Sequence, residues 1–403
     1  MSSSSPKGVA TTAIRKSRSI LSGPKGTPQE TICQVVDYGG TTGGSFISAM
    51  QSLARAVVRR GDRFVVVARD IPGSSWGGDL REAGAEVYFV RTGAEAVRVL
   101  QRIRPSIVHS HHNGFDLATL KTPANARIIW HARSHRQDVS LLARAKAVLK
   151  YRVFGRRVEK LITVSESLAR ECIAFSAPAH WVRAVKNGID TERSRPPTPA
   201  ERKAARDAFG IGAADRVVLF FERHPYKGGA TLKLALEKLE DVRLLVVGGT
   251  KADRALFGGP PRVISLDRVL EAREAYWAAD VLAFASENEA FGFVLAEALA
   301  CGLPVAATDI PVVREICGRT FQAVLFPVRD GNAMAAALRE AIGRSGLSGR
   351  DRIVERFSLE RWTADILELY YSPGLETHGN RRPRAPLRRR PRGGARARTS
   401  KRP

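Results

Sequence analysis

The chain of 403 residues is long enough for two domains, and 44% hydrophobic residues with five Trp supply apolar side chains for two cores. No apolar run approaches the roughly 20 residues that a membrane-spanning helix needs, which argues against an integral membrane protein. The four cysteines show no C-x-x-C pair and no metal-ligand spacing. We therefore expect reduced thiols, as in a cytoplasmic protein, rather than disulfides or a zinc site.

The net charge of +25 is concentrated towards the two ends of the chain. Residues 376–403 carry +10 in a segment rich in Arg, Pro and Gly, and residues 1–30 carry +4, which leaves +11 for the rest. Both ends have too few apolar residues to build a core, so we expect disordered basic extensions over residues 1–30 and 373–403. The Ser-rich, basic N-terminus also has the composition of an organelle transit peptide, and this alternative stays open.

The first half of the chain alternates strand and helix patterns. Residues 32–38 and 63–69 are apolar runs of strand length, and residues 46–61 between them are a helix pattern that ends in Gly. This opening predicts a parallel, doubly wound sheet. The Gly-rich turn G-G-T-T-G-G lacks the G-x-G-x-x-G spacing, which argues against a nicotinamide-dependent enzyme.

Two later strands of this half end in histidines. The run S-I-V-H-S-H-H places His109, His111 and His112 at the carboxyl edge of the sheet, where open α/β sheets bind ligands. Three histidines this close also suggest a metal, but only Asp116 lies nearby as an acidic ligand, so we expect no metal. The next strand ends near His131, whose neutral imidazole could bond a hydroxyl group or handle a proton.

The segment from Arg133 to Lys160 carries nine Lys or Arg and two acidic residues. It contains the helix-like run V-S-L-L-A-R-A-K-A-V-L-K-Y-R-V-F-G, which as a basic amphipathic helix would contact an anionic membrane surface. On a helical wheel, however, Arg152 and Arg156 fall among the apolar positions. A solvated, partly packed helix is an equally good interpretation.

A Pro-rich polar linker begins near residue 191, and a second series of strands and helices follows it. In residues 281–315 a strand, V-L-A-F-A, leads through the turn S-E-N-E-A-F-G into the helix F-V-L-A-E-A-L-A and a further strand. Glu289 lies in the turn, and Glu297 lies in the helix about 9 Å further along its axis at 1.5 Å per residue. Between them, the first helical turn has unpaired N–H groups that suit a phosphate.

This stretch resembles the donor-binding signature of retaining glycosyltransferases with the GT-B fold, family 4 (glycosyl transferases group 1) in particular. The usual signature is S-x-x-E-G-F-G-x-x-x-x-E-A-M-A-C-G-x-P-V, and this chain has Ala290 for the first Gly and Leu299 for the Met. The resemblance covers roughly residues 31–372. It implies an α/β fold of two Rossmann-like domains that face a central cleft.

The domains that follow from the resemblance are an acceptor-side domain over residues 31–190 and a nucleotide-sugar-binding domain over residues 191–355. A last helix over residues 356–372 is expected to cross back to the first domain. Tyr276, Ala279 and Asp280 precede the signature, and we interpret them as packing and capping residues.

The resemblance also implies roles for individual residues. Glu289 would contact the donor sugar and Glu297 the ribose, while the helix start would hold the phosphates through Phe291, Gly292, Phe293 and Val294. His131 matches a histidine that lies close to the reacting sugar, with His109 as the alternative.

Two further pairs of residues match the family pattern. Gly43 and Gly44 match a Gly-Gly pair that faces the donor phosphates and the acceptor, although a tight turn that needs positive φ would also explain them. Arg223 and Lys227 match the cations that neutralise the donor diphosphate. One residue fewer separates them here than in the usual R-x-x-x-x-K-G, so Lys227 and Gly228 keep the family register and Arg223 departs from it by one position.

The function implied is metal-independent transfer of a sugar, with retention, from a UDP- or GDP-sugar to a sugar or lipid-linked hydroxyl acceptor, in cell-surface polysaccharide or glycolipid synthesis. The chain contains no Asp-x-Asp pair, so we expect no divalent cofactor. We expect a cytoplasmic protein, with contact to the inner membrane face as a further hypothesis.

Two competing functions stay open. One is a sugar-nucleotide 2-epimerase of the same fold, which would share the cleft. The other is a nucleic-acid-binding protein that uses the Arg-rich tail. The tail has no interleaved aromatic residues to stack on bases, so we expect no specific nucleic acid partner.

Overall fold

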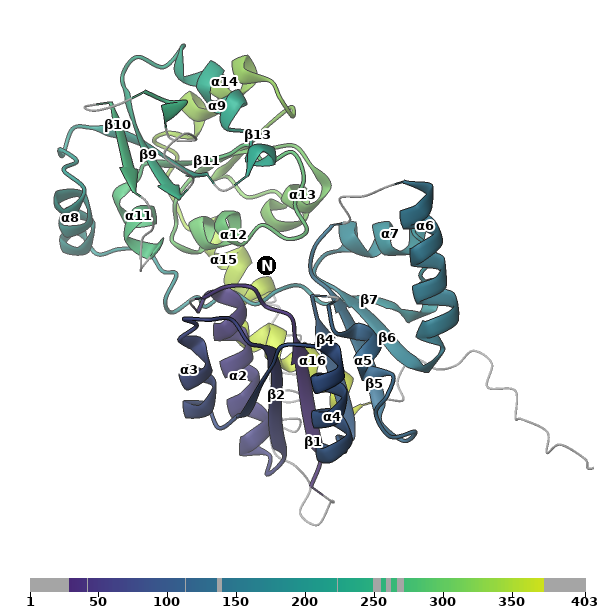
Figure 1. Cartoon of the computed structure of the whole chain (residues 1–403). Coiled ribbons are helices and arrows are strands. Elements are labelled where there is room, and N and C mark those ends of the chain that lie inside the picture. Colours follow the sequence, from purple (N-terminus) through teal and green to yellow (C-terminus); the bar gives the residue numbers. More distant parts are fainter. Residues whose placement is uncertain are drawn as a thin grey trace, which may run out of the picture.

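The structure is a computed structural model that describes residues 29–41, 43–112, 114–135, 140–222, 224–248, 255–258, 262–266 and 272–372. Residues 1–28 of the predicted N-terminal extension, the whole predicted C-terminal extension and the predicted site residue Arg223 lie outside these ranges. Figure 1 shows two α/β domains.

The N-terminal domain is built on a parallel sheet with strand order β3-β2-β1-β4-β5-β6-β7. Its inner strands are largely buried, apolar runs, as expected where helices cover both faces of a parallel sheet, whereas the edge strands β3 and β7 are partly exposed. The strands are β1 (Thr31–Val36), β2 (Arg63–Arg69), β3 (Glu86–Val90), β4 (Ile107–His111), β5 (Arg127–Ala132), β6 (Val158–Thr163) and β7 (Val182–Ala184). The helices are α2 (Ser45–Arg59), α3 (Trp76–Glu82), α4 (Gly93–Ile103), α5 (Asp116–Thr119), α6 (Leu141–Val148) and α7 (Glu166–Ala174), with the short turns η1 (Leu149–Val153), η2 (Phe154–Arg157) and η3 (Ala179–Trp181).

The C-terminal domain repeats this plan with the order β10-β9-β8-β11-β12-β13, again all parallel. The strands are β8 (Arg216–Glu222), β9 (Val242–Gly248), β10 (Val263–Leu266), β11 (Val281–Phe284), β12 (Val305–Thr308) and β13 (Ala323–Phe326). The helices are α8 (Pro199–Ala208), α9 (Gly229–Leu236), α11 (Ala272–Ala278), α12 (Phe293–Ala300), α13 (Pro311–Cys317), α14 (Gly331–Ala341) and α15 (Ser348–Phe357), with the turn η4 (Pro225–Lys227) before α9.

Each sheet has one point where the strand order reverses, between β1 and β4 in the first domain and between β8 and β11 in the second. Ligands of open α/β sheets bind outside the carboxyl ends of the strands at such a point. The loops that leave these four strands are the Gly-rich turn, the turn at His112, the loop with Lys227 and the loop with Glu289. The topology therefore gathers separate stretches of sequence at two facing edges.

The chain returns to the first domain at its last helix, α16 (Leu359–Tyr371). Figure 1 shows this helix, in yellow, among the purple and blue elements of the N-terminal domain. The Trp362 side chain is 1% exposed and lies in that domain's core with residues of α2. Just before the crossing, Phe357 at the end of α15 still packs within the C-terminal domain, with its ring 6.0 Å from that of Phe291.

Backbone hydrogen bonds fix the point of return. The Ile189 N–H donates to the Phe357 carbonyl at 2.6 Å, and the Leu359 N–H donates to the Ile189 carbonyl at 3.0 Å. A Cβ on the neighbouring Gly188 would lie 2.9 Å from the Cβ of Trp362, so the close approach of α16 requires Gly there.

No helix in the described part of the chain is long and apolar enough to cross a membrane. The four cysteines, Cys33, Cys172, Cys301 and Cys317, are buried free thiols.

Candidate functional site

A cleft of about 900 Å³ lies between the carboxyl edges of the two sheets. The N-terminal domain lines it with Gly43 and Gly44 among others. The C-terminal domain contributes Lys227 and the predicted signature residues Glu289, Phe291, Gly292, Phe293, Val294 and Glu297. The structure therefore brings most of the residues singled out from the sequence to one cavity, although they come from opposite domains.

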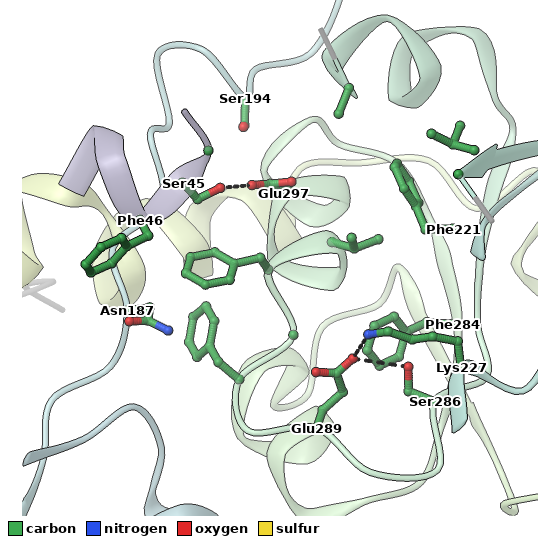
Figure 2. A pocket seen from close by; sticks show the side chains of 18 of the residues that line it. Ser45, Phe46, Asn187, Ser194, Phe221, Lys227, Phe284, Ser286, Glu289 and Glu297 are labelled. Carbon is green, nitrogen blue, oxygen red and sulfur yellow. Dashed lines mark hydrogen bonds and ion pairs between the residues drawn. The ribbon is translucent and has the colours of Figure 1, made fainter. Parts of the chain in front are cut away.

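Lys227 and Glu289 form an ion pair in this cleft, and their side chains are 18% and 14% exposed. The Ser286 hydroxyl donates to the same carboxylate oxygen, Oε1 of Glu289, at 3.2 Å, as Figure 2 shows. The Thr308 hydroxyl donates to the Ser286 carbonyl at 2.6 Å and so fixes the turn that carries Glu289. The carboxylate is thus oriented before any ligand binds.

Gly228 explains why the Lys227 loop reaches this carboxylate. Its φ of 82° lies in the left-handed region, and a Cβ there would come within 2.2 Å of the Ala285 carbonyl oxygen. The loop after β8 therefore passes directly against the end of β11. The Glu287 N–H, which donates to the Tyr226 carbonyl at 2.9 Å, joins the two loops.

Two helices begin at the cleft with N–H groups that no side chain caps. Gly44 is the N-cap of α2 and Gly292 is the N-cap of α12, and neither helix has an acidic residue in its first turn. The partial positive charge of both helix starts therefore remains available to an anion. An acidic cap would have cancelled this charge.

The backbone of the Gly-rich turn excludes one of the explanations offered from the sequence. Neither Gly43 nor Gly44 has a positive φ, and Gly44 is extended at −147°. Side chains other than Gly could adopt this backbone, so a strained turn does not account for the pair. What the two glycines provide is an uncovered start of α2.

Glu297 is held from both domains. The Tyr276 hydroxyl donates to Oε2 of Glu297 at 2.9 Å, and the Ser45 hydroxyl of α2 donates to Oε1, the contact drawn in Figure 2. Packing is the role expected for Tyr276 from the sequence, and its ring does lie 5.5 Å from that of Phe221. Its hydroxyl has a second role, because it orients Glu297. That its hydroxyl orients Glu297 could not be predicted from local sequence, because the partner lies one strand and one loop further on.

His131 does not lie on the cleft wall. Its side chain is 1% exposed, and its Nδ1 is 3.1 Å from Nε2 of His109. On the N-terminal side the cleft is lined by His112, in a left-handed conformation with φ of 65°, and on the C-terminal side by His224. Burial and the nearby Arg133 guanidinium lower the pKa of His112 to about 3, so its imidazole is neutral at physiological pH.

Three cations of the cleft were not singled out from the sequence: Arg133, Arg193 and Arg273. Burial lowers the pKa of Arg133 to about 9, which still leaves it charged near neutral pH. Its Nη1 donates to Oδ1 of Asn187 at 2.8 Å, and the guanidinium carbon lies 4.5 Å from the centre of the Phe46 ring. The basic run around Arg133 could have drawn attention to it, whereas Arg193 and Arg273 lie in segments without a distinctive pattern.

Comparison with known families covers both halves of the chain. Residues 48–193 match the model described as Glycosyltransferase Family 4, and residues 215–344 match the model described as Glycosyl transferases group 1. The chain belongs to these glycosyltransferases. Solved structures agree in fold with this family assignment. A glycosyltransferase from Rickettsia africae superposes with a TM-score of 0.73 at 17% identity, over 86% of this chain and 99% of that one.

Anabaena HepE in complex with UDP-glucose gives a TM-score of 0.71 at 18% identity, over 85% of this chain and 99% of that one. The predicted GT-B fold is thereby confirmed. Among curated proteins, a D-inositol 3-phosphate glycosyltransferase from Xylanimonas cellulosilytica is 33% identical over 218 residues, which is 49% of this chain and 52% of the relative. The chain spans about half the length of the curated relatives it matches.

A second contact between the two domains involves His135. Its Nε2 donates to the Glu289 carbonyl at 2.6 Å, and its Nδ1 donates to the Glu171 carboxylate. Both ring nitrogens thus face acceptors, which favours the imidazolium. Burial lowers the pKa of His135, but these hydrogen bonds outweigh burial and leave the pKa raised. The charged ring therefore clamps the Glu289 loop to the N-terminal domain.

This clamp predicts a pH-dependent contribution to stability. A group whose pKa is raised by folding stabilises the protein fully below its ordinary value, about 6.5 for His, and the stabilisation is lost as the pH rises through the raised value. We expect the wild-type protein to unfold at a higher temperature than His135→Asn near pH 6, with a difference that shrinks towards pH 9. Thermal unfolding across this range measures it. His180→Asn, at an exposed histidine, is the control, and a difference that grows with pH would contradict the clamp.

Proposed function

We propose that this chain transfers a sugar from a nucleoside-diphosphate sugar to a hydroxyl group, with retention of the anomeric configuration. The main support is the cleft itself, where the oriented Glu289, the Lys227 ammonium and the open start of α12 surround one space. Glu289 would accept hydrogen bonds from the donor sugar, and Glu297, further along α12, would accept them from the ribose. The UDP-glucose bound to HepE favours a UDP-sugar over a GDP-sugar as donor.

The diphosphate leaving group would be neutralised without a metal ion. An ammonium has three donors, so Lys227 can keep its pair with Glu289 and still donate to a phosphate oxygen. The N–H groups at the start of α12 would hold the second phosphate. Arg223 keeps its proposed role beside Lys227, although it lies outside the described residues.

The acceptor is proposed to be a sugar or a lipid-linked hydroxyl, in cell-surface polysaccharide or glycolipid synthesis. The relatives named for D-inositol 3-phosphate favour a second candidate, a small phosphorylated polyol. The Arg133 guanidinium on the N-terminal wall of the cleft would suit its phosphate.

Removing the charge of Glu297 should weaken donor binding. Glu297→Gln keeps the shape but loses a charged acceptor, and hydrogen bonds to charged groups are worth about 1.5–3 kcal/mol. We expect UDP to bind roughly tenfold or more weakly in titration calorimetry, since 1.4 kcal/mol corresponds to a factor of ten. Glu274→Gln on the exposed face of α11 is the matched control. Equal UDP affinity in Glu297→Gln and wild type would remove this assignment.

The metal-free site makes its own prediction. Turnover should survive EDTA and fall in Lys227→Ala, because loss of one preorganised group that stabilises the leaving charge costs on the order of 10²–10³ in kcat. Lys233→Ala, at an exposed position on the following helix, should leave turnover unchanged. Sugar transfer from radiolabelled UDP-sugars to a panel of acceptors is the assay. A strict requirement for Mg²⁺ or Mn²⁺ would contradict the proposal.

We further propose that the segment from α6 to η2 binds an anionic membrane surface. The apolar side chains Leu141 and Leu142 are 86% and 64% exposed, and Leu149 and Phe154 are exposed nearby. The exposed cations of the same segment are Lys146, Arg152 and Arg156 among others. Unpaired apolar side chains beside cations fit the interface of an anionic bilayer, which takes up both.

The membrane proposal predicts co-sedimentation with anionic vesicles that falls with salt. Cations near such a surface contribute about 1 kcal/mol each and are screened by ions. Replacing Leu141 and Leu142 with Ser should lower binding about tenfold or more, because each buried Leu is worth about 1.5–3 kcal/mol. Leu234→Ser, at an apolar residue 51% exposed on the other domain, is the control. A truncation after Ser372 separates the contribution of the tail. Absence of binding to anionic vesicles, or equal binding to neutral ones, would end this proposal.

A further inference from the structure

A continuous chain of buried hydrogen bonds runs from the cleft wall through the interior of the N-terminal domain. Its successive donor–acceptor distances are 3.1, 2.9, 3.0, 2.6 and 3.1 Å. Apart from Arg133, every side chain in it is 2% exposed or less. In order, the chain joins Arg133, His111, Gln34, Tyr370, His109 and His131.

Arg133 sets the donor–acceptor direction of the first hydrogen bonds in this network. A guanidinium can only donate, so its Nε donates to Nδ1 of His111, which must be the acceptor. A neutral His111 then carries its proton on Nε2, and this N–H donates to the Oε1 carbonyl of Gln34. Burial and the charges of its neighbours, Arg133 among them, lower the pKa of His111, which keeps the ring neutral.

Gln34 sets the donor–acceptor direction of the remaining hydrogen bonds. Its amide Nε2 donates to the Tyr370 oxygen, and the single hydroxyl proton of Tyr370 then donates to Nδ1 of His109. The His109 proton is therefore on Nε2, where it donates to Nδ1 of His131. The last proton lies on Nε2 of His131, a buried atom with no hydrogen-bond partner among the described residues.

The reversed arrangement is less favourable. If His131 donated to His109 and His109 to the Tyr370 oxygen, the hydroxyl proton of Tyr370 would lose its acceptor. The Nε2 atom of His131 would then also be an acceptor without a donor. Besides Nη2 of Arg133, which lacks a partner in either arrangement, two buried polar groups would be unsatisfied instead of one, and each such group costs about 1–3 kcal/mol.

We propose that Tyr370 and His109 are positioning residues that hold His131 in the Nε2–H tautomer, so that His131 presents a hydrogen-bond donor to a ligand oxygen. His131 pairs in register with His111 of the neighbouring strand. Both strands lead directly to the cleft, because His112 follows His111 and Arg133 lies two residues after His131, and both His112 and Arg133 line it. His131 thus lies just beneath the wall of the proposed acceptor side. Among the described residues, two donors of this hydrogen-bond network have no partner, Nη2 of Arg133 at the cleft wall and Nε2 of His131 behind it.

The tautomer follows from the structure alone, whereas the ligand oxygen rests on the proposed function. The arrangement makes Tyr370 part of the site although it lies on α16, the helix that returns from the other domain. It also distinguishes between the two roles open for His131 from the sequence, a hydrogen bond to a hydroxyl group and the transfer of a proton. The ring is a donor at Nε2 and cannot accept a proton there.

A metal ion is the competing use of these imidazoles. The ligand atoms of His109, His111 and His131 lie within 4.8 Å of one another. A cation among them would face the Arg133 guanidinium, whose Nε is already bonded to His111, and it would displace the hydrogen bond between His109 and His131. The charge repulsion and the lost hydrogen bonds favour the proton-ordered chain.

The tautomers can be read directly from the ligand-free protein. Long-range ¹H–¹⁵N correlation spectra of ¹⁵N-histidine-labelled protein distinguish protonated from unprotonated ring nitrogens, and single His→Gln variants assign the signals. We expect His109, His111 and His131 each to carry the proton on Nε2 at neutral pH. A His131 proton on Nδ1, a charged ring, or stoichiometric Zn²⁺ uptake that shifts all three rings would overturn the inference.

Tyr370→Phe tests the positioning role, with Tyr371→Phe as the matched control. Tyr371 is the next residue of the same helix, and its hydroxyl donates to Asp62, which is not part of this hydrogen-bond network. In Tyr370→Phe we expect the His109 and His131 signals to become a mixture of tautomers and kcat for sugar transfer to fall about tenfold, the effect of one lost hydrogen bond. The control should change neither. Unchanged tautomers in a folded Tyr370→Phe would refute the role, and because the spectra need no substrate, they separate this failure from a failure of the proposed reaction.

Discussion

The return of the chain at Ser358 is the constraint on which the rest of the structure depends. The Ile189 N–H donates to the Phe357 carbonyl and the Ile189 carbonyl accepts from the Leu359 N–H, which holds the last crossing beside the first one, and Gly188 lets α16 approach closely. Two domains joined at two adjacent points can hinge but cannot separate. The cleft between them therefore keeps its two facing sheet edges, and the first domain gains a helix for its core.

Electrostatics then determines what the cleft accepts. Two helix starts and several cations face it, while Glu289 and Glu297 are each held in place by hydroxyl groups and, for Glu289, by Lys227. Such an arrangement binds an anion at fixed points and leaves oriented acceptors for hydroxyl groups. It requires little reorganisation when a ligand arrives, because the dipoles and the carboxylates are already directed.

The histidines near the cleft show how burial and hydrogen bonding assign different states to one residue type. His135 has acceptors at both ring nitrogens and is favoured as the cation. For His112 and His131, loss of water around the ring and, second, the charge of Arg133 lower the pKa and keep the imidazoles neutral. The clamp and the hydrogen-bond chain follow from these surroundings rather than from sequence position.

The sequence by itself determined the doubly wound sheets and the β-α-β signature around Glu289 and Glu297, because hydrophobic period and turn residues are local properties. It could not place His131 beneath the cleft wall, show the hydroxyl of Tyr276 at Glu297, or bring Tyr370 beside His109 across 261 positions. These contacts exist only after strands from distant segments pair and α16 crosses back. Local patterns specify elements, whereas hydrogen-bond partners depend on which elements tertiary packing makes neighbours.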